Sequence, residues 1–201
     1  MKADIEKRII DMANKEKGFI RTRDILAAKI HNTYLKELLK AGKLEQVKRG
    51  LYRLTDVSVS AHDSLIQAAM SVPHGVVGML SALAYYNLTT VTPWEVSVVI
   101  EKGKKAFLPS YPPIKIYHFT SPIFSAGITN VNVDGHSLRI YNKEKTICDC
   151  IRYRNQLGMD VVRESLRIYL KNSTRDLDML VKYAKLCKVE KILKNYLEVL
   201  L

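Results

Sequence analysis

The N-terminal part of the chain opens with the spacing of an amphipathic helix. Ile5, Ile9, Met12 and Ala13 follow the i, i+4, i+7, i+8 pattern, and Gly18 is placed to end the helix. Their spacing puts all four side chains on one face, so a first helix with a single buried side is expected before residue 18.

Two shorter helices are expected next. Thr22 is positioned to cap a second helix that presents Ile25 and Leu26 to the core. A third helix is expected over residues 32–40, with its leucines facing inward and Gly42 after its end. Three helices with a tight connection between the last two describe a helix-turn-helix.

A β-hairpin is expected after the third helix. Residues 44–47 and 51–54 are short apolar runs around a basic tip, which is typical of a wing. In such a module the third helix enters the major groove of DNA and cations hold phosphates. We expect residues 1–56 to form a winged helix-turn-helix domain that binds double-stranded DNA. The residues expected to face the groove, at the start of the third helix, are Asn32, Thr33, Tyr34 and Lys36. The residues expected to hold phosphates are Lys48 and Arg49 on the wing, and Arg21 and Arg23 before and within the second helix.

Residues 57–201 are expected to form a second, α+β domain. Its polar start, residues 58–60, predicts a short joint rather than a long linker, and two helical patterns follow at 63–70 and 79–87. A small mixed or antiparallel sheet of about four strands comes next, with strands expected at 96–101, 114–119, 128–133 and 136–141. A hairpin turn at Asp134-Gly135 is expected to join the last two strands.

The chain is expected to close with four helices from residue 143 onward, because apolar residues recur there with a helical period. Asn142, Asp160 and Thr174 are available as caps. A basic stripe at i, i+4, i+8 lies on the second of these helices, at Arg163, Arg167 and Lys171. It is either a solvated face or a second contact with nucleic acid or an acidic protein.

Net charge adds weight to a polyanionic partner. The 201 residues carry 32 Lys and Arg against 20 Asp and Glu, a formal net charge of +12. The excess lies at the two ends, with 14 against 8 in residues 1–56, 5 against 4 in 57–140, and 13 against 8 in 141–201. Winged helices also serve as protein-binding modules, but those have no reason to concentrate cations at the wing tip.

Cysteine usage and hydropathy favour a cytoplasmic protein without membrane contact. No apolar run approaches the roughly 18 residues of a membrane span, and the N-terminus lacks the apolar core of a signal peptide. Cys148, Cys150 and Cys187 are expected as buried thiols, because the histidines are scattered singly and complete no zinc set. We expect no metal and no cofactor.

The sequence offers no catalytic template. GxSxG, the P-loop, HExxH and GxGxxG after a strand are all missing, and the acidic residues of the middle region lack the spacing of paired carboxylates. Asp149 is expected to form an ion pair with its neighbours Arg152 and Arg154 rather than to act in catalysis. We therefore expect no catalytic residues and no enzymatic activity.

The order of motifs resembles the AbiEi-type antitoxins, regulators of type IV toxin–antitoxin systems in abortive infection and phage defence. The motifs are KRGLY at 48–52, LSALAYYNLT at 80–89, VSVVI at 96–100 and EKTICDCIRYRN at 144–155. The resemblance implies a repressor that binds inverted repeats in the promoter of its own operon. It also implies a functional partner, a nucleotidyltransferase-like toxin, which the larger domain would counter without a stable complex.

Two other functions stay open. One is a winged-helix regulator whose second domain senses a small-molecule effector, in a pocket near the Pro-rich residues 108–113. The other is an enzyme that acts on nucleic acid, which only the basic C-terminal helices suggest.

Overall fold

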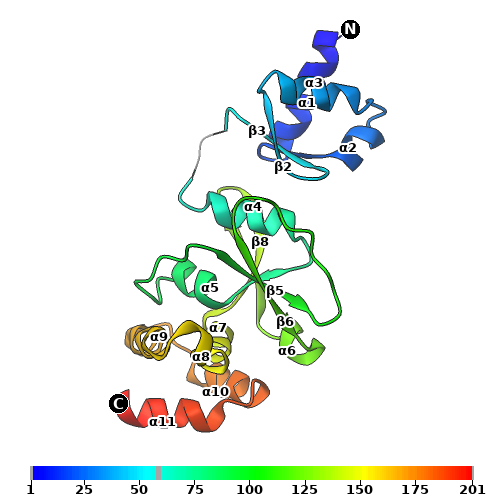
Figure 1. Ribbon diagram of the computed structural model, residues 1–201. Coiled ribbons are helices and arrows are strands. Elements are labelled where there is room, and N and C mark those ends of the chain that lie inside the picture. The colour runs from blue at the N-terminus through cyan, green and yellow to red at the C-terminus, as the bar shows by residue number, and fades with distance from the viewer. Residues whose placement is uncertain (1, 58–59, 201) are drawn as a thin grey trace.

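The computed structural model describes residues 2–57 and 60–200, which lie in three layers along one axis (Figure 1). The winged-helix unit forms one end, a mixed sheet lies in the middle, and a helical layer forms the other end. The chain termini lie at opposite ends of this stack. Of the polar joint expected at 58–60, residues 58 and 59 lie outside the described part of the chain.

The N-terminal unit has the predicted three helices and hairpin, with one added strand. The first strand pairs antiparallel with the third, which gives a three-stranded sheet in the order β1-β3-β2. The elements are α1 (Lys2–Lys15), β1 (Phe19–Arg21), α2 (Thr22–Ala27), α3 (Thr33–Lys40), β2 (Leu44–Lys48) and β3 (Leu51–Leu54).

The second unit contains a five-stranded mixed sheet in the order β6-β5-β4-β8-β7. Strands β5 and β6 are parallel, as are β4 and β8, whereas β4–β5 and β7–β8 are antiparallel. The elements up to the end of the sheet are α4 (Asp63–Ser71), β4 (Val76–Val77), α5 (Met79–Tyr85), β5 (Val96–Glu101), β6 (Ile114–Phe119), α6 (Ser121–Ser125), β7 (Ile128–Val133) and β8 (His136–Tyr141).

Helix α4 lies between the two sheets. Its buried residues Leu65, Ile66 and Ala68 share one core with Phe19 and Leu51 of the winged-helix sheet. The same core includes residues from one face of the mixed sheet, namely Val77, Val98, Ile100, Leu138 and Ile140. The other face of the winged-helix sheet packs under α1, α2 and α3. The small sheet is therefore buried on both faces, and one continuous core joins the two units.

The helical layer covers the opposite face of the mixed sheet. It consists of α7 (Lys143–Arg152), α8 (Arg154–Leu157), α9 (Met159–Lys171), α10 (Leu177–Leu186) and α11 (Glu190–Leu200). Helix α7 is its centre, because it contacts α5, α9, α10 and α11. The three cysteines lie here as buried free thiols, as expected.

Several sequence predictions are wrong in detail. Strand β4 and helix α6 were not expected, the sheet has five strands rather than four, and α8 makes a fifth helix in the last layer. Leu26 is 54% exposed instead of buried, although Ile25 is buried as expected. It lies near the end of a six-residue helix whose other side Ile25 occupies.

The predicted helix caps also differ from the observed ones. Asn142 caps α7 by accepting a hydrogen bond from the backbone N–H of Lys145, as expected. Thr22 is instead the first residue of α2, and Asp160 lies inside the first turn of α9, whose cap position is Gly158. Asp176 replaces Thr174 as the cap of α10.

Asp149 pairs with Lys145 rather than with the neighbouring arginines. Lys145 Nζ lies 2.7 and 2.6 Å from the two carboxylate oxygens, and neither side chain is exposed. The ammonium also lies 4.3 Å from the centre of the Tyr141 ring and 4.9 Å from that of Phe119. Burial raises the pKa of Asp149 to about 6, against the opposing effect of Lys145.

Breaking this pair from one side is expected to be costly. Lys145→Met leaves an uncompensated buried carboxylate, so the free energy of unfolding should fall by about 3–5 kcal/mol. The double variant Lys145→Met/Asp149→Leu removes both charges and should recover most of that loss. Urea unfolding of the wild type, both single variants and the double variant tests this, and additive losses in the double variant would contradict it.

Candidate nucleic-acid interface

Helix α3 presents the polar face expected of a recognition helix. Leu35 and Leu38 are buried beneath it, whereas Asn32, Thr33 and Lys36 are exposed. The predicted groove-facing residue Tyr34 is half-buried and packs against the winged-helix core. The structure thus brings three of the four predicted residues to one open surface and holds the fourth at its edge.

The first turn of α3 is held by a side chain that the sequence did not single out. His31 Nδ1 lies 2.6 Å from the hydroxyl of Thr33 and accepts a 3.3 Å hydrogen bond from the Thr33 backbone N–H. His31 is itself exposed, next to Asn32 at the start of the helix. It therefore orients the Thr33 hydroxyl at the surface where bases would be read.

The two wing-tip cations have different surroundings. Arg49 is exposed and makes no ion pair or side-chain hydrogen bond with any residue that the structure describes. Lys48 is half-buried, and its Nζ donates to the carbonyl oxygens of Ser71 at 2.5 Å and of Phe107 at 3.3 Å. The strand pairing is irregular between Gln46 and Lys48, which allows Lys48 to turn toward α4.

Arg21 and Arg23 divide in the same way. Arg21 Nη2 donates to the carbonyl oxygen of Met70 at 3.1 Å, whereas the side chain of Arg23 is 80% exposed and lies 3.3 Å from Asp24. Burial lowers the pKa of Arg21, and Arg23 lowers it further. Burial also lowers the pKa of Lys48, with a smaller contribution from Arg21.

Lys48 and Arg21 both donate to the last carbonyls of α4. A helix end carries unpaired carbonyls and a partial negative charge, so cations there are stabilising. In this conformation Arg21 makes one hydrogen bond to α4, and Lys48 makes one to α4 and one to Phe107 in the segment before β6. Among the predicted phosphate contacts of the N-terminal unit, Arg23 and Arg49 are the ones that face outward.

A third cation at the junction, Arg53, was missed by sequence reasoning. Its side chain is 6% exposed, and Nη2 and Nη1 lie 2.7 and 2.9 Å from the carboxylate of Asp63 on α4. Gln67 donates to the same carboxylate at 2.7 Å, and the guanidinium lies 5.8 Å from the centre of the Phe19 ring. An arginine at an inward position of an apolar strand is a signal for a buried partner, but its partner cannot be read from spacing.

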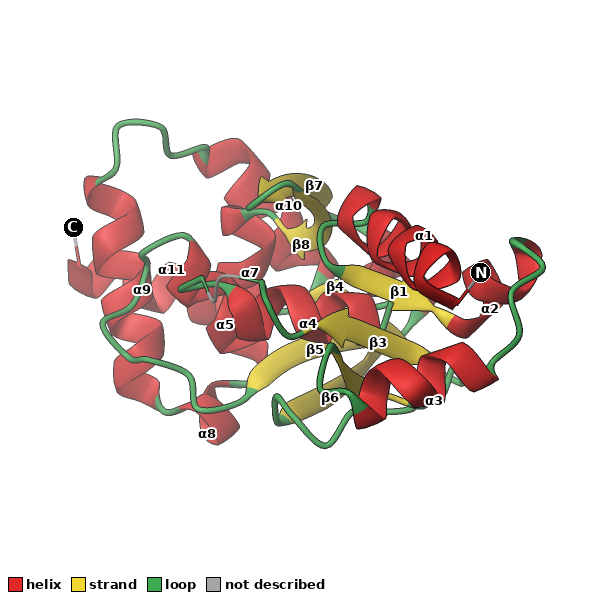
Figure 2. Ribbon diagram, turned by 90° about the horizontal axis from the view of Figure 1, so that it is seen from above, coloured by secondary structure: helices red, strands yellow, loops and turns green. Residues whose placement is uncertain are grey.

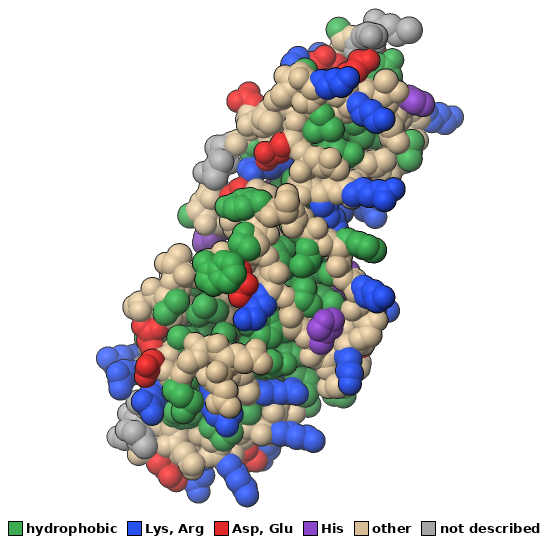
Figure 3. All heavy atoms as spheres, in the orientation of Figure 1, with side chains coloured by type: hydrophobic (Ala, Val, Ile, Leu, Met, Phe, Trp, Pro, Cys, Tyr) green, Lys and Arg blue, Asp and Glu red, His purple; other side chains and the backbone are tan. Residues whose placement is uncertain are grey.

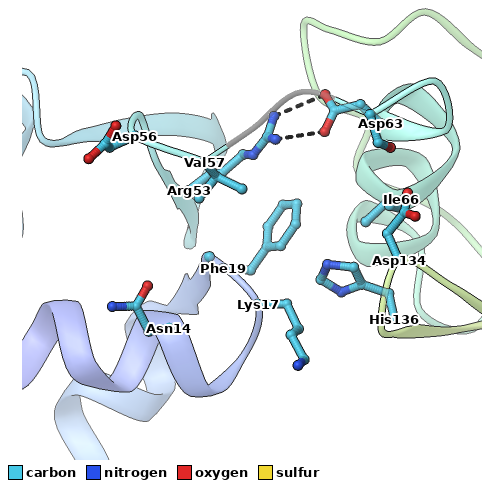
Figure 4. Close-up of a pocket in the computed structure, with 12 residues that line it drawn as sticks. Asn14, Lys17, Phe19, Arg53, Asp56, Val57, Asp63, Ile66, Asp134 and His136 are labelled. Carbon is cyan, nitrogen blue, oxygen red and sulfur yellow. Dashed lines mark hydrogen bonds and ion pairs between the residues drawn. The ribbon is translucent and has the colours of Figure 1, made fainter.

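The Arg53–Asp63 pair borders a cavity of about 490 Å³ between the two units (Figure 4). Phe19 points into it from the winged-helix side and His136 from the mixed sheet, with their ring centres 5.5 Å apart in an edge-on arrangement. Burial lowers the pKa of His136. The expected effector pocket near residues 108–113 has no counterpart in this cavity, because none of those residues lines it.

The second basic surface lies at the other end of the molecule, on α9 (Figure 1). Arg163, Arg167 and Lys171 are all exposed, and Arg163 makes one ion pair, 3.8 Å from Asp160. Arg154 joins Arg163 and Arg167 around a cavity of about 590 Å³, which Lys171 does not line. Two of the three stripe residues thus line this cavity, and Lys171 lies outside it.

Within residues 2–57 and 60–200, no group of three or more His, Cys, Asp or Glu side chains is arranged to hold a metal ion. No helix in those ranges has the length and apolar character needed to cross a membrane.

Comparison with known proteins gives one family match and a fold relative. Residues 7–55 match the family model described as "Transcriptional regulator, AbiEi antitoxin", which confirms the resemblance over the winged-helix unit. The crystal structure of the RV2827C protein from Mycobacterium tuberculosis has a TM-score of 0.55 and 11% identity, over 97% of this chain and 81% of that one. This likeness confirms the α+β fold alone. The search of curated proteins found no match.

The contrast between the two wing cations can be measured without DNA. Lys48→Ala removes two hydrogen bonds that join the wing to α4 and the 102–113 segment, and we expect it to lower the free energy of unfolding by about 1–2 kcal/mol. Arg49→Ala, one residue along, should stay within about 0.5 kcal/mol of the wild type. Chemical denaturation of both variants decides the matter, and equal stabilities would contradict the positioning role of Lys48.

Proposed function

We propose that this chain, whose residues 7–55 match the AbiEi antitoxin family, is a DNA-binding transcriptional autorepressor and the antitoxin of a type IV toxin–antitoxin system. The observation that carries the proposal is the open polar face of α3 together with the exposed wing residue Arg49, which makes no ion pair among the described residues, all within the matched segment. The family match supports a role in transcriptional regulation.

The docking arrangement follows from these exposures. Asn32, Thr33 and Lys36, with Tyr34 at the edge, enter the major groove, because they are the polar residues on the open side of α3. Arg49 and Arg23 contact phosphates. Lys48 and Arg21, which the sequence pattern also assigns to phosphates, instead fix the wing against α4. The operator would be a pair of inverted repeats in the chain's own promoter.

The second unit carries the antitoxin function in this proposal. Its functional partner is a nucleotidyltransferase-like toxin, which it counters without forming a stable complex. Arg163, Arg167 and Lys171, with Arg154 beside them, offer it a second anion-binding surface. The matched family is described as one of regulators, which supports a non-enzymatic role.

A second candidate function is regulation by a small-molecule effector. The observation in its favour is the cavity between the units, bordered by Arg53, Asp63 and His136. A ligand there would contact the winged-helix sheet and the mixed sheet together. Thermal-shift screening of metabolites tests it, and a stabilising metabolite that also changes operator affinity would support it.

DNA binding can be dissected by charge and position. Arg49→Ala should weaken binding to the upstream promoter and to a scrambled duplex alike. The slope of log K against log salt concentration should become shallower by about one, because one phosphate contact is lost. Asn32→Ala should reduce the free energy of binding to the promoter by about 1–3 kcal/mol and leave binding to the scrambled duplex unchanged. Fluorescence anisotropy at several salt concentrations measures both.

The matched control for these variants is Lys191→Ala. It removes the same charge from α11, at the end of the molecule away from the winged helix (Figure 1). An Arg49→Ala variant that behaves like Lys191→Ala on both duplexes would refute the docking arrangement.

The antitoxin role is separable from DNA binding. When the toxin gene from the same operon is expressed, co-expression of the wild type should restore growth, and so should the Asn32→Ala/Arg49→Ala variant, because the second unit is unchanged. Colony counts measure the rescue, and co-purification tests for a complex. Failure of both proteins to rescue would refute the antitoxin role and leave the DNA-binding result standing.

A further inference from the structure

The segment between β5 and β6, residues 102–113, carries two adjacent exposed apolar side chains. Phe107 is 83% exposed and Leu108 is 44% exposed. Large apolar side chains are usually withdrawn from water, so a protruding phenyl ring with a second apolar neighbour marks a contact surface. Neither residue belongs to the α3 face or the wing described above.

This segment is held beside the wing tip. The Phe107 carbonyl oxygen accepts a hydrogen bond from Lys48 Nζ at 3.3 Å, so the backbone of the segment is joined to the residue that precedes Arg49. Figure 1 shows the segment running up from the mixed sheet toward the β2–β3 hairpin. Seen from above, α3 and β6 lie toward the same side of the molecule and α1 toward the other (Figure 2).

The charge around Phe107 suits a polyanion. Lys102, Lys104 and Lys105 precede it, all three exposed, and none forms an ion pair with any residue in the described ranges. Arg49, which follows Lys48 on the wing, adds an exposed cation one residue from the Lys48–Phe107 hydrogen bond. Figure 3 shows Lys and Arg side chains along this edge of the molecule, from the winged-helix end down to the sheet.

We propose that Phe107, with its exposed neighbour Leu108, is an apolar wedge that enters the minor groove of the double-stranded DNA held by the winged helix. Phenylalanine and leucine are the residue types that proteins insert between base steps, while nearby cations hold the flanking phosphates. Lys104 and Lys105 contact the backbone beside the inserted ring. This inference rests on the proposed DNA binding and extends the DNA interface to the second unit.

Phe107→Ala should weaken binding to the upstream promoter roughly tenfold, since a ring stacked on a base contributes on this scale. The salt dependence should not change, because no charge is removed. Lys104→Ala/Lys105→Ala should instead make the slope of log K against log salt concentration shallower by about two, because two phosphate contacts are lost. Trp94→Ala is the matched control, because Trp94 is 78% exposed but lies in the segment before β5 rather than after it.

The chain's single tryptophan allows a direct readout. In the variant Trp94→Phe/Phe107→Trp the only indole stands at the proposed wedge, and saturating promoter DNA should quench its fluorescence by stacking. The wild-type Trp94 emission should stay constant in the same titration.

The outcomes separate this inference from the function on which it rests. A wild type that does not bind the promoter would refute the proposed DNA binding. A wild type that binds, with Phe107→Ala equal to Trp94→Ala and an unquenched indole signal in the double variant, would overturn the wedge alone.

Discussion

The burial of helix α4 between two sheets is the constraint on which the rest of the structure depends. The winged-helix sheet has no free face, because one face lies under its own three helices and the other lies on α4. The mixed sheet uses the opposite side of α4 for its own core. Apolar contacts of this extent fix the orientation of α3 relative to the second unit. They also bring the 102–113 segment to the wing, where the Lys48 bond fixes it.

The polar groups of the junction follow from the same burial. Helix α4 ends next to the wing, and its last carbonyls need donors, which Arg21 and Lys48 supply. Its first residue, Asp63, is partly buried and takes Arg53 as its counter-ion. Cations of the winged helix therefore have two distinct environments: Arg21, Lys48 and Arg53 bond carbonyl or carboxylate oxygens at the junction, whereas Arg23 and Arg49 are exposed. Composition cannot distinguish them, because arginines occur in both.

What the sequence predicts correctly is mostly local. Strands β5, β6, β7 and β8 have the expected bounds, since each is a six-residue run with its own pattern. Strand β4 is the central strand of the sheet but is only two residues long, and Val76–Val77 carries no periodicity. For the site, the exposed face of α3 was predictable from leucine spacing. The partners of Lys48, Arg53 and Asp149 could not be predicted from the sequence. Lys48 and Arg53 find theirs in the other unit, and the partner of Asp149 depends on which of several nearby cations is buried with it.

The doubly buried sheet also bears on how such a protein can evolve. A winged helix that tolerates exchange between regulators needs a solvated outer surface, so that it can be joined to any effector unit by a linker. Here Phe19, Val47 and Leu51 share one apolar core with α4 and the mixed sheet of the second unit. Recombination at the boundary near residue 57 would leave both fragments with an uncovered apolar face. The surface of α3 should therefore change by point substitution rather than by exchange of the whole winged helix, and the two units should be inherited together as one piece.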